Sequence, residues 1–300
     1  MKAVVMTKTG DPNVLKEMTL DRPVPKAKQV LVQNFAAAIE PFDCKIRSGA
    51  IPLDQPLPLI LGSSVAGKII QVGSEVTKFK IGQRVAASPH FRSYAEYTAI
   101  GQSQLAVIPD NVGYVQAAAA ALSGQTAWQL VQEVKNTPLP QGALLVNGAS
   151  GNVGQVLTQV LLHDFTEVYV TVGQTAAVKM QQLFPTIKII NLADLDQPLA
   201  AIVDLVGNDE LEKTLTKNLL PQGHLWSAVR NFPDPDQRTS LFGMKSRGTS
   251  LEELLTAIAA GKVTLQIAQV QPFSLTSVQQ LQTVRHQFGK SVLQFEVKEP

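Results

Sequence analysis

Cysteine is nearly absent from this chain, because only one of its 300 residues is a cysteine. Cys44 therefore has no second thiol with which to form an internal disulfide. Structural zinc sites take clustered cysteine and histidine ligands, whereas the four histidines here are dispersed along the sequence. The sequence thus excludes a disulfide framework and a cysteine-based structural zinc.

Charged residues are also scarce, and they are balanced in sign. They make up 17% of the chain, with 26 lysines and arginines against 24 aspartates and glutamates, for a net charge of +2. The basic residues are scattered, so the chain carries no electrostatic footprint for nucleic acid or for a membrane surface. Hydrophobic residues make up 45%, which argues against disorder. We expect a compact globular protein with no nucleic-acid or membrane partner.

Long hydrophobic runs are missing as well. The longest segment without charge, residues 136–163, contains Pro138, Pro140 and several glycines, so it does not fit a membrane-spanning helix. The apolar stretch in residues 1–8 is interrupted by charge and is too short for the core of a secretory signal. We therefore expect a soluble, cytoplasmic protein.

The first part of the chain has the pattern of a small β-barrel. Short β-branched runs alternate with Gly, Pro and Asp turn signals, at residues 3–7, 30–35, 64–72, 84–87 and 94–100. The texture changes at an alanine-rich stretch, residues 117–122, after which helical spacing begins. This change predicts a domain boundary near residue 118.

The second part alternates strands and helices. The predicted strands are residues 143–147, 167–172, 187–190, 201–206 and 224–229, and the predicted helices are residues 152–163, 175–184, 209–219 and 250–260. Such alternation is typical of an α/β fold with a doubly wound parallel sheet. The β pattern returns after Gly261. We therefore predict that residues 119–263 form an α/β domain inserted into a β domain made of residues 1–118 and 264–300.

The most informative segment is the turn at residues 148–154, with the sequence GASGNVG. An apolar strand precedes it, and a helix with one apolar face follows at once. Gly151 lets the backbone approach a pyrophosphate, and Gly154 lets the helix pack closely on the strand. The helix N-terminus offers N–H donors and partial positive charge to phosphates. We interpret the segment as a dinucleotide-binding turn; the alternative is a purely structural turn.

The residues after the next strand bear on the choice of cofactor. An Asp or Glu at that point would bind the ribose hydroxyls of NAD, but residues 172–175 are Val-Gly-Gln-Thr. No carboxylate repels a 2′-phosphate there, and Thr175 and Lys179 are possible donors to it. This favours NADPH over NADH, with a solvated Lys179 as the alternative.

Ordered motifs along the whole chain carry a resemblance. They are DCKIRSG at residues 43–49, LPLILG at 57–62, VGSEVTKFKIGQRV at 72–85, YAEY at 94–97, GQTAW at 124–128, the turn at 148–154, VDLVG at 203–207 and GKSVL at 289–293. With these motifs the chain resembles the medium-chain dehydrogenase/reductase superfamily. Within that superfamily it is similar to the zinc-free quinone oxidoreductase and enone reductase-like branch.

The resemblance implies a Rossmann-type doubly wound parallel sheet inserted into a GroES-like β-barrel domain, with bound NADP(H). It also implies a homodimer. In zinc-dependent relatives, a Cys and a His hold the catalytic metal at the positions of Glu40 and Ser63, so no metal is expected here. The chain departs from the similar quinone reductases at three positions: Glu40 replaces Asn, Ser64 replaces an acidic residue, and Lys45 replaces a Tyr found in many of them.

The expected chemistry is hydride transfer from the nicotinamide to a small molecule, either a quinone or an α,β-unsaturated carbonyl. The acceptor oxygen gains negative charge and needs a donor, for which Lys45 is the first candidate and Tyr94 the second. Glu40 is interpreted as a pocket carboxylate or as an acceptor for the nicotinamide ribose. The alternatives are a surface lysine at position 45 and an exposed turn residue at position 40.

The resemblance places Thr126 against the nicotinamide. With the turn and the ends of the following strands, the predicted cofactor-binding residues are Thr126, Gly148, Ala149, Ser150, Gly151, Asn152, Val153, Gly154, Gly173, Gln174, Thr175, Lys179, Val206, Gly207, Ala228 and Val229. Two other functions stay open at this point. One is an NADPH-binding redox sensor or structural protein without turnover, and the other is a metal-free alcohol dehydrogenase relative.

Overall fold

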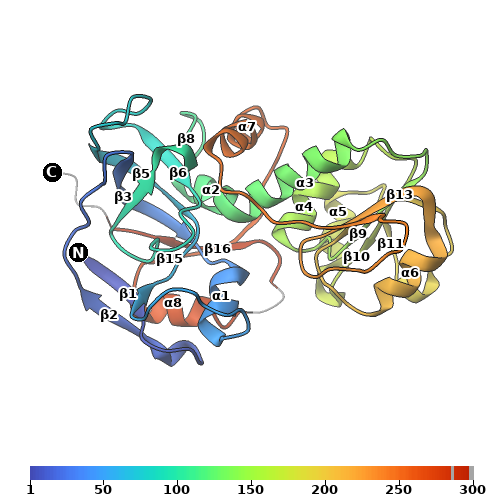
Figure 1. Cartoon of the computed structure of the whole chain (residues 1–300), viewed down its shortest axis with the longest axis horizontal. Coiled ribbons are helices and arrows are strands. Elements are labelled where there is room, and N and C mark those ends of the chain that lie inside the picture. Colours follow the sequence, from blue (N-terminus) through green and yellow to red (C-terminus); the bar gives the residue numbers. More distant parts are fainter. Residues whose placement is uncertain (285–286, 297–300) are drawn as a thin grey trace. The chain divides into compact units, whose positions relative to one another are not determined.

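The computed structural model describes residues 1–284 and 287–296, in two compact units (Figure 1). Unit 1 comprises residues 1–125 together with residues from 246 onward, and unit 2 comprises residues 126–245. The predicted boundaries at 118 and 263 are therefore displaced. The C-terminal boundary moves because α7 (Gly248–Ala259) packs on unit 1, where a Cβ on Gly248 would lie 2.0 Å from the carbonyl oxygen of Leu105.

Unit 1 contains two sheets. The smaller sheet has the order β2-β1-β4, and the larger has the order β15-β16-β3-β5-β6-β8, with β7 paired to β3. The strands are β1 (Lys2–Met6), β2 (Leu15–Thr19), β3 (Gln29–Ala38), β4 (Leu59–Ile60), β5 (Val65–Val72), β6 (Arg84–Ala87), β7 (Tyr97–Gly101), β8 (Leu105–Val107), β15 (Ile267–Pro272) and β16 (Lys290–Gln294). The C-terminal strands β15 and β16 thus complete a sheet that the N-terminal part begins.

The helices of unit 1 are α1 (Pro41–Ser48), α2 (Tyr114–Ala119), η3 (Ala120–Gly124), α7 and α8 (Leu275–Leu281), with short turns η1 (Pro12–Val14) and η2 (Gln102–Gln104). Helix α1 begins with Pro41, whose fixed φ suits a first turn, and ends at Gly49, whose φ of 82° favours glycine. The side chains of Cys44 and Ile46, on α1, are buried in the core of unit 1. These ends fix which side chains of α1 point inward.

Unit 2 is a parallel sheet with the order β11-β10-β9-β12-β13-β14. The strands are β9 (Ala143–Asn147), β10 (Val168–Thr171), β11 (Lys188–Ile189), β12 (Leu199–Asp204), β13 (Leu219–Ser227) and β14 (Thr239–Leu241). The helices are α3 (Gln125–Asn136), α4 (Asn152–Leu161), η4 (Gln174–Ala176), α5 (Ala177–Leu183), η5 (Leu192–Asp194) and α6 (Glu210–Asn218). The predicted doubly wound parallel sheet is confirmed.

Strand β9 marks the switch point of this sheet. Strands β10 and β11 follow on one side of β9, and β12, β13 and β14 follow on the other. In open parallel sheets a crevice forms at the carboxyl ends of the strands where the order reverses. All five residues of β9 are buried, because helices cover both faces of a doubly wound sheet. The turn at residues 148–154 therefore lies at the position where such sheets bind ligands.

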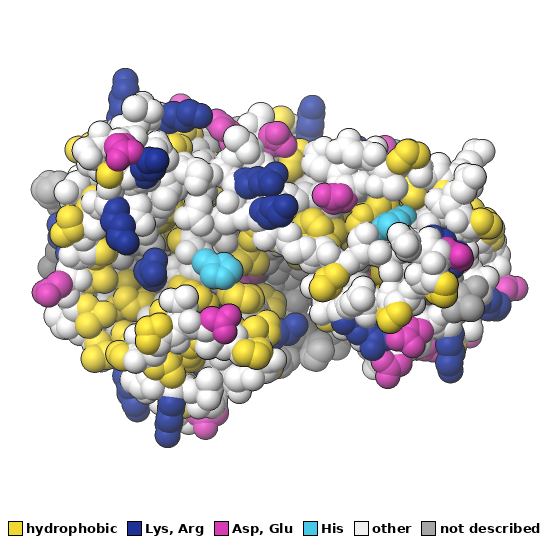
Figure 2. Space-filling model, viewed as in Figure 1, with side chains coloured by type: hydrophobic (Ala, Val, Ile, Leu, Met, Phe, Trp, Pro, Cys, Tyr) yellow, Lys and Arg dark blue, Asp and Glu magenta, His cyan; other side chains and the backbone are white. Residues whose placement is uncertain are grey.

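No helix in residues 1–284 and 287–296 has the length and apolar character needed to cross a membrane. On the face shown in Figure 2, basic and acidic side chains are interspersed among polar and hydrophobic ones.

Candidate functional site

Two glycines of the turn at residues 148–154 are required by the backbone itself. Gly148 has a φ of 90°, and a Cβ there would lie 2.7 Å from Cγ2 of Val206. A Cβ on Gly154 would lie 2.5 Å from Cα of Ala149, so the first turn of α4 packs directly on the chain that leaves β9. Both glycines therefore serve the fold of the turn, whatever it binds.

Gly151 is different, because nothing in the protein requires a glycine there. It is the N-cap of α4 with an ordinary extended backbone, φ −73° and ψ 164°, and it is exposed. A Cβ would meet only the carbonyl oxygen of Gly148, at 3.7 Å. No side chain caps α4, so its first N–H groups point toward the space beside Gly151. An open helix N-terminus of this kind suits a phosphate group.

The loop after β10 lies beside this turn. The backbone N–H of Gly173 donates to Ser150 Oγ at 3.4 Å, which joins the two loops. Gln174, Thr175 and Lys179 are exposed, and a Cβ on Gly173 would meet nothing within 4 Å. The segment 172–179 contains Lys179 and no carboxylate. The loop therefore leaves open, uncharged or basic surface next to the turn.

The loops after β12 and β13 lie at the same end of the sheet as this turn, where the carboxyl ends of the strands meet. Val206 is 50% exposed and Val229 is 40% exposed, which is unusual for large apolar side chains. Gly207 has a φ of 78°, and Ala228 is half-buried. Thr126, half-buried, lies in the first turn of α3. The structure thus brings together, at the carboxyl ends of the strands of one sheet, the predicted residues at 148–154, 173–175, 206–207 and 228–229.

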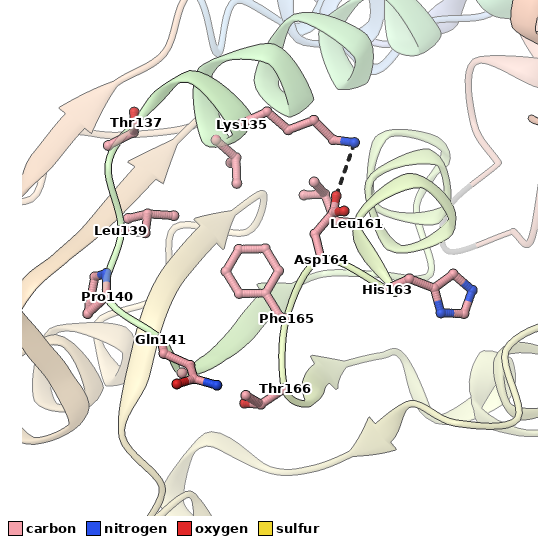
Figure 3. Close-up of a pocket in the computed structure, with 12 residues that line it drawn as sticks. Lys135, Thr137, Leu139, Pro140, Gln141, Leu161, His163, Asp164, Phe165 and Thr166 are labelled. Carbon is pink, nitrogen blue, oxygen red and sulfur yellow. Dashed lines mark ion pairs between the residues drawn. The ribbon is translucent and has the colours of Figure 1, made fainter.

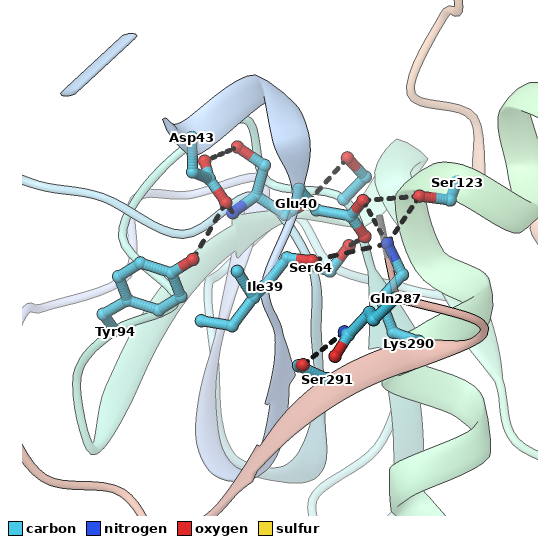
Figure 4. A network of polar contacts seen from close by, with 11 residues as sticks. Ile39, Glu40, Asp43, Ser64, Tyr94, Ser123, Gln287, Lys290 and Ser291 are labelled. Carbon is cyan, nitrogen blue, oxygen red and sulfur yellow. Dashed lines mark hydrogen bonds and ion pairs between the residues drawn. The ribbon is translucent and has the colours of Figure 1, made fainter. Parts of the chain in front are cut away.

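In unit 1, Glu40 is fully buried at the N-cap of α1. Ser64 donates a hydrogen bond of 2.7 Å to Oε1 of its carboxylate, and Ser123 donates one of 2.5 Å to Oε2. Lys290 Nζ lies 2.6 Å from the same Oε2 (Figure 4). We refer to these four residues as the Glu40 cluster. Glu40 is therefore not an exposed turn residue, and side chains of unit 1 engage both of its carboxylate oxygens.

Lys290 is a residue of this cluster to which the sequence analysis gave no role. It is 2% exposed, and its ammonium group also donates to Ser123 Oγ at 2.7 Å and to the carbonyl oxygen of Ile39 at 3.4 Å. Charges buried this deeply persist only when they are paired and hydrogen-bonded. The signal in the sequence was a lysine at the start of a buried strand, but its partner lies 250 residues away.

Asp43 lies one turn after Glu40 on α1 and is also fully buried. Burial, with a smaller contribution from the charge of Glu40, raises the pKa of the Asp43 carboxyl to about 7. Hydrogen bonds from Ser63 and Tyr94 oppose this rise. The carboxyl therefore titrates near neutral pH.

The hydrogen bonds around Ser63 agree with a protonated Asp43. Ser63 Oγ lies 2.6 Å from Asp43 Oδ1 and 2.6 Å from the carbonyl oxygen of His90. A hydroxyl carries one proton and can donate to only one of these oxygens. Both contacts are hydrogen bonds when Asp43 donates to Ser63 and Ser63 donates to His90. The other oxygen, Oδ2, accepts from the Ser63 backbone N–H at 3.1 Å and from the Tyr94 hydroxyl at 3.2 Å.

This carboxyl gives the folded protein a specific pH dependence. In the unfolded chain Asp43 ionises near its ordinary pKa of 3.8, whereas in the folded protein it keeps its proton up to about pH 7. Between these pH values the folded state binds more protons than the unfolded chain. The free energy of unfolding therefore falls as the pH rises, by up to about 1.4 kcal/mol per pH unit. Above about pH 7 this contribution is constant. Denaturation in urea at several pH values measures the slope.

The matched variant for this experiment is Asp43→Asn. The amide nitrogen can donate to Ser63 Oγ as the protonated acid does, and the amide oxygen can accept from the Ser63 N–H and from Tyr94. The variant is therefore expected to fold and to lose this part of the slope between pH 4 and 7. Equal slopes in wild type and variant would show that Asp43 is ionised throughout.

The structure places the two predicted donors in different environments. Tyr94 is fully buried and donates to Asp43, and burial followed by the charge of Asp43 raises the pKa of its hydroxyl well above the usual 10.0. Lys45 is exposed on α1. The ring of Phe42, on α1, forms a cluster with those of His90 and Phe91, with centroids 5.2 to 6.0 Å apart. Of the two donors, only Lys45 reaches the surface of unit 1.

A groove in unit 2 lies at the opposite end of the sheet, beside the amino ends of β9 and β10 (Figure 3). It is lined by the C-terminal ends of α3 and α4 and by Gln141 and Gly142, which precede β9. Lys135 and Asp164 form an ion pair of 3.0 Å beside it. Ligands of doubly wound sheets bind at the carboxyl ends of the strands, so we assign no cofactor to this groove.

Comparisons with known proteins agree with this geometry. A family model described as "Alcohol dehydrogenase GroES-like domain" matches residues 26–160. The 2-methylene-furan-3-one reductase of Solanum lycopersicum is 32% identical over 295 residues, which cover 93% of this chain and 74% of that protein. The chloroplastic NADPH-dependent alkenal/one oxidoreductase of Arabidopsis thaliana is 30% identical over 296 residues, with coverage of 93% and 74%.

The solved structures give the same result at the level of the fold. The quinone oxidoreductase from Coxiella burnetii superposes with a TM-score of 0.86, at 25% identity, over 99% of this chain and 99% of that one. A GroES-like unit together with a Rossmann-type parallel sheet is the architecture of a dehydrogenase or reductase. The chain belongs to the medium-chain dehydrogenase/reductase superfamily, in its quinone oxidoreductase and enone reductase branch, and it is an oxidoreductase.

Proposed function

We propose that this protein is a zinc-independent, NADPH-dependent oxidoreductase that transfers hydride to a quinone or to an α,β-unsaturated carbonyl. The observation that carries the proposal is the open N-terminus of α4 beside Gly151, at the switch point of a parallel sheet. The relatives support the acceptor class, because the similar proteins are a furanone reductase, an alkenal/one oxidoreductase and a quinone oxidoreductase.

The residues of unit 2 fit a dinucleotide. The pyrophosphate would be held by residues 150–154, because no side chain caps the first N–H groups of α4 and the space beside Gly151 is open. A 2′-phosphate would be held by Thr175 and Lys179, which are exposed in a segment without carboxylates. The Arabidopsis relative is named as NADPH-dependent, which supports the same choice. When bound, the reduced nicotinamide supplies the hydride.

The Glu40 cluster supports chemistry without zinc. The ammonium group of Lys290 lies against the carboxylate of Glu40, so it compensates the negative charge that a metal ion would otherwise balance. Ser63, the other position of a metal ligand in zinc-dependent relatives, is engaged with Asp43 and His90. Within residues 1–284 and 287–296, no group of three or more His, Cys, Asp or Glu side chains could hold a metal ion. We propose that the acceptor oxygen is stabilised by Lys45, which α1 presents at the surface.

The experiment is NADPH oxidation by the chelator-treated protein. Ortho- and para-quinones and short enones serve as acceptors, with NADH in parallel and alcohols plus NADP⁺ as the reverse assay. We expect turnover with NADPH at least about tenfold above that with NADH, because the segment 172–179 favours the 2′-phosphate. Activity that needs added zinc would overturn the proposal. Saturable NADPH binding without turnover on any acceptor would instead favour a redox sensor.

We also propose that the protein is a cytoplasmic homodimer. The expected contact is an edge of the parallel sheet in unit 2, where β14 is the outermost strand beside β13. Its residue Leu241 is 58% exposed, which is consistent with an apolar contact. Sedimentation of the wild type against Leu241→Lys would test this contact.

A further inference from the structure

Four polar side chains form a hydrogen-bonded row across unit 2. Thr171 ends β10, Asn147 ends β9, Asp204 ends β12 and Ser227 ends β13. The parallel register pairs them in turn, Thr171 with Asn147, Asn147 with Asp204, and Asp204 with Ser227. We refer to these residues as the strand-end row. The row therefore crosses the carboxyl ends of four adjacent strands at the switch point of the sheet.

The side chains of the row are joined directly. Thr171 Oγ1 donates to Asn147 Oδ1 at 2.6 Å, and Asn147 Nδ2 donates to Asp204 Oδ1 at 2.8 Å. Ser227 Oγ donates to Asp204 Oδ2 at 2.7 Å. Asp204, fully buried, is the acceptor in which the bonds from both sides meet. A change at Asp204 therefore reaches both sides of the row.

The row also holds the loops that follow these strands. Asp204 Oδ1 accepts from the backbone N–H groups of Val206, at 3.1 Å, and Gly207, at 3.0 Å. Ser227 Oγ accepts from the N–H groups of Val229 and Arg230, both at 3.2 Å.

On the other side of the row, Thr171 Oγ1 accepts from the N–H of Gly148 at 2.9 Å. The three loops held in this way include the predicted cofactor residues Gly148, Val206, Gly207 and Val229.

The buried carboxylate of Asp204 depends on the hydrogen bonds that reach it. The donors that reach its two oxygens are neutral amide, backbone N–H and hydroxyl groups. A carboxylate in the interior must be compensated by such donors, or it is costly to bury. The N–H groups bound to it and to Ser227 are directed into the sheet. The loops after β12 and β13 expose the side chains of Val206 and Val229.

We propose that Asp204 is a positioning residue for the dinucleotide, because it fixes the loops after β9, β12 and β13 in one arrangement through the strand-end row. This inference rests on the proposed function. The turn after β9 then offers donors to the phosphates. The loops after β12 and β13 offer the apolar surface of Val206 and Val229, which suits the nicotinamide ring.

The test compares graded variants of the row. Asp204→Ala removes the acceptor for all its donors, whereas Asp204→Asn keeps one oxygen for Asn147, Val206 and Gly207. Ser227→Ala and Thr171→Val each release one side of the row, and they serve if Asp204→Ala does not fold. We expect the dissociation constant for NADPH to rise about a hundredfold in Asp204→Ala and about tenfold or less in the other three.

Asn218→Ala is the matched control. Asn218 is a buried amide of unit 2 that donates to the carbonyl oxygens of Leu195 and Gln197, in the chain that leads into β12 at the opposite edge. This variant is expected to lower the melting temperature without changing the dissociation constant. Hydrogen exchange at the Val206, Gly207 and Val229 amides should accelerate in Asp204→Ala and not in Asn218→Ala, a readout that needs no ligand.

The outcomes separate the inference from the proposed function. A wild type that binds no NADPH overturns the proposed function and the role of the row with it. A wild type that binds NADPH, with row variants that bind equally well or with amides that exchange as in the control, overturns the inference alone. An NADPH affinity that falls equally in Asn218→Ala also overturns it, because the effect would then follow general stability.

Discussion

Replacing Gly151 with leucine is expected to weaken dinucleotide binding strongly and to leave the protein folded. The side chain would project from the N-cap of α4 into the space assigned to the pyrophosphate. The protein itself tolerates it, because a Cβ at this position meets only one oxygen at 3.7 Å and the backbone conformation is an ordinary extended one. We expect the affinity for NADPH to fall at least about a hundredfold, or about 2.7 kcal/mol. Titration calorimetry with NADPH and NADP⁺ measures the loss.

The chain offers a closely matched control in Gly113→Leu. Gly113 is the N-cap of α2, with φ −75° and ψ 157°, and a Cβ there would lie 3.8 Å from the nearest side-chain atom. Both variants replace an exposed N-cap glycine, so both should cost similar helix stability. Only the variant at Gly151 should lose NADPH. If its affinity is unchanged, the pyrophosphate does not bind at this turn.

Replacing Glu40 with glutamine is expected to destabilise the protein by about 3 to 5 kcal/mol. The substitution keeps the shape of the side chain but leaves the Lys290 ammonium group, 2% exposed, without its counter-charge. Lys290→Met leaves the opposite charge unpaired and should cost a similar amount. In the double variant no charge remains, so its loss of stability should be well below the sum of the two single losses. Urea denaturation at pH 7 gives the three values.

An exposed ion pair of the same chain provides the contrast. Lys135 and Asp164 form a pair of 3.0 Å in which both side chains are 42% exposed. Asp164→Asn should therefore cost less than about 1 kcal/mol, because water solvates the remaining charge. If Glu40→Gln costs no more than Asp164→Asn, the charges of the Glu40 cluster are not buried in the folded protein.

The fold could be predicted from the sequence where local patterns carry it. The apolar strand before Gly148 and the helix after Gly151 predicted β9 and α4, and the alternation that followed predicted the parallel sheet. Each of these signals lies within a short segment of the sequence. The boundaries of the units were less accurate, because α7 has a helical pattern like those of unit 2 but packs against β8 of unit 1.

The candidate site shows the same limit. Glu40 was singled out, but its neutralisation by Lys290 depends on contact between residues 250 positions apart. The strand-end row was missed for a related reason. Asn147, Thr171, Asp204 and Ser227 become neighbours only through the register of four strands, and no spacing in the sequence encodes that register. Polar residues at the ends of consecutive apolar strands were the one available signal.

The ion pair between Glu40 and Lys290 also restricts how this protein can change over generations. Unit 1 is built from two stretches of chain, and the pair joins one stretch to the other. Replacing either residue alone with an uncharged one leaves an unpaired charge in the interior. The two residues can therefore be replaced only together, or through a single variant of lower stability. A chimera that takes its last fifty residues from a relative without a lysine at this point would inherit half of the pair and should fold poorly.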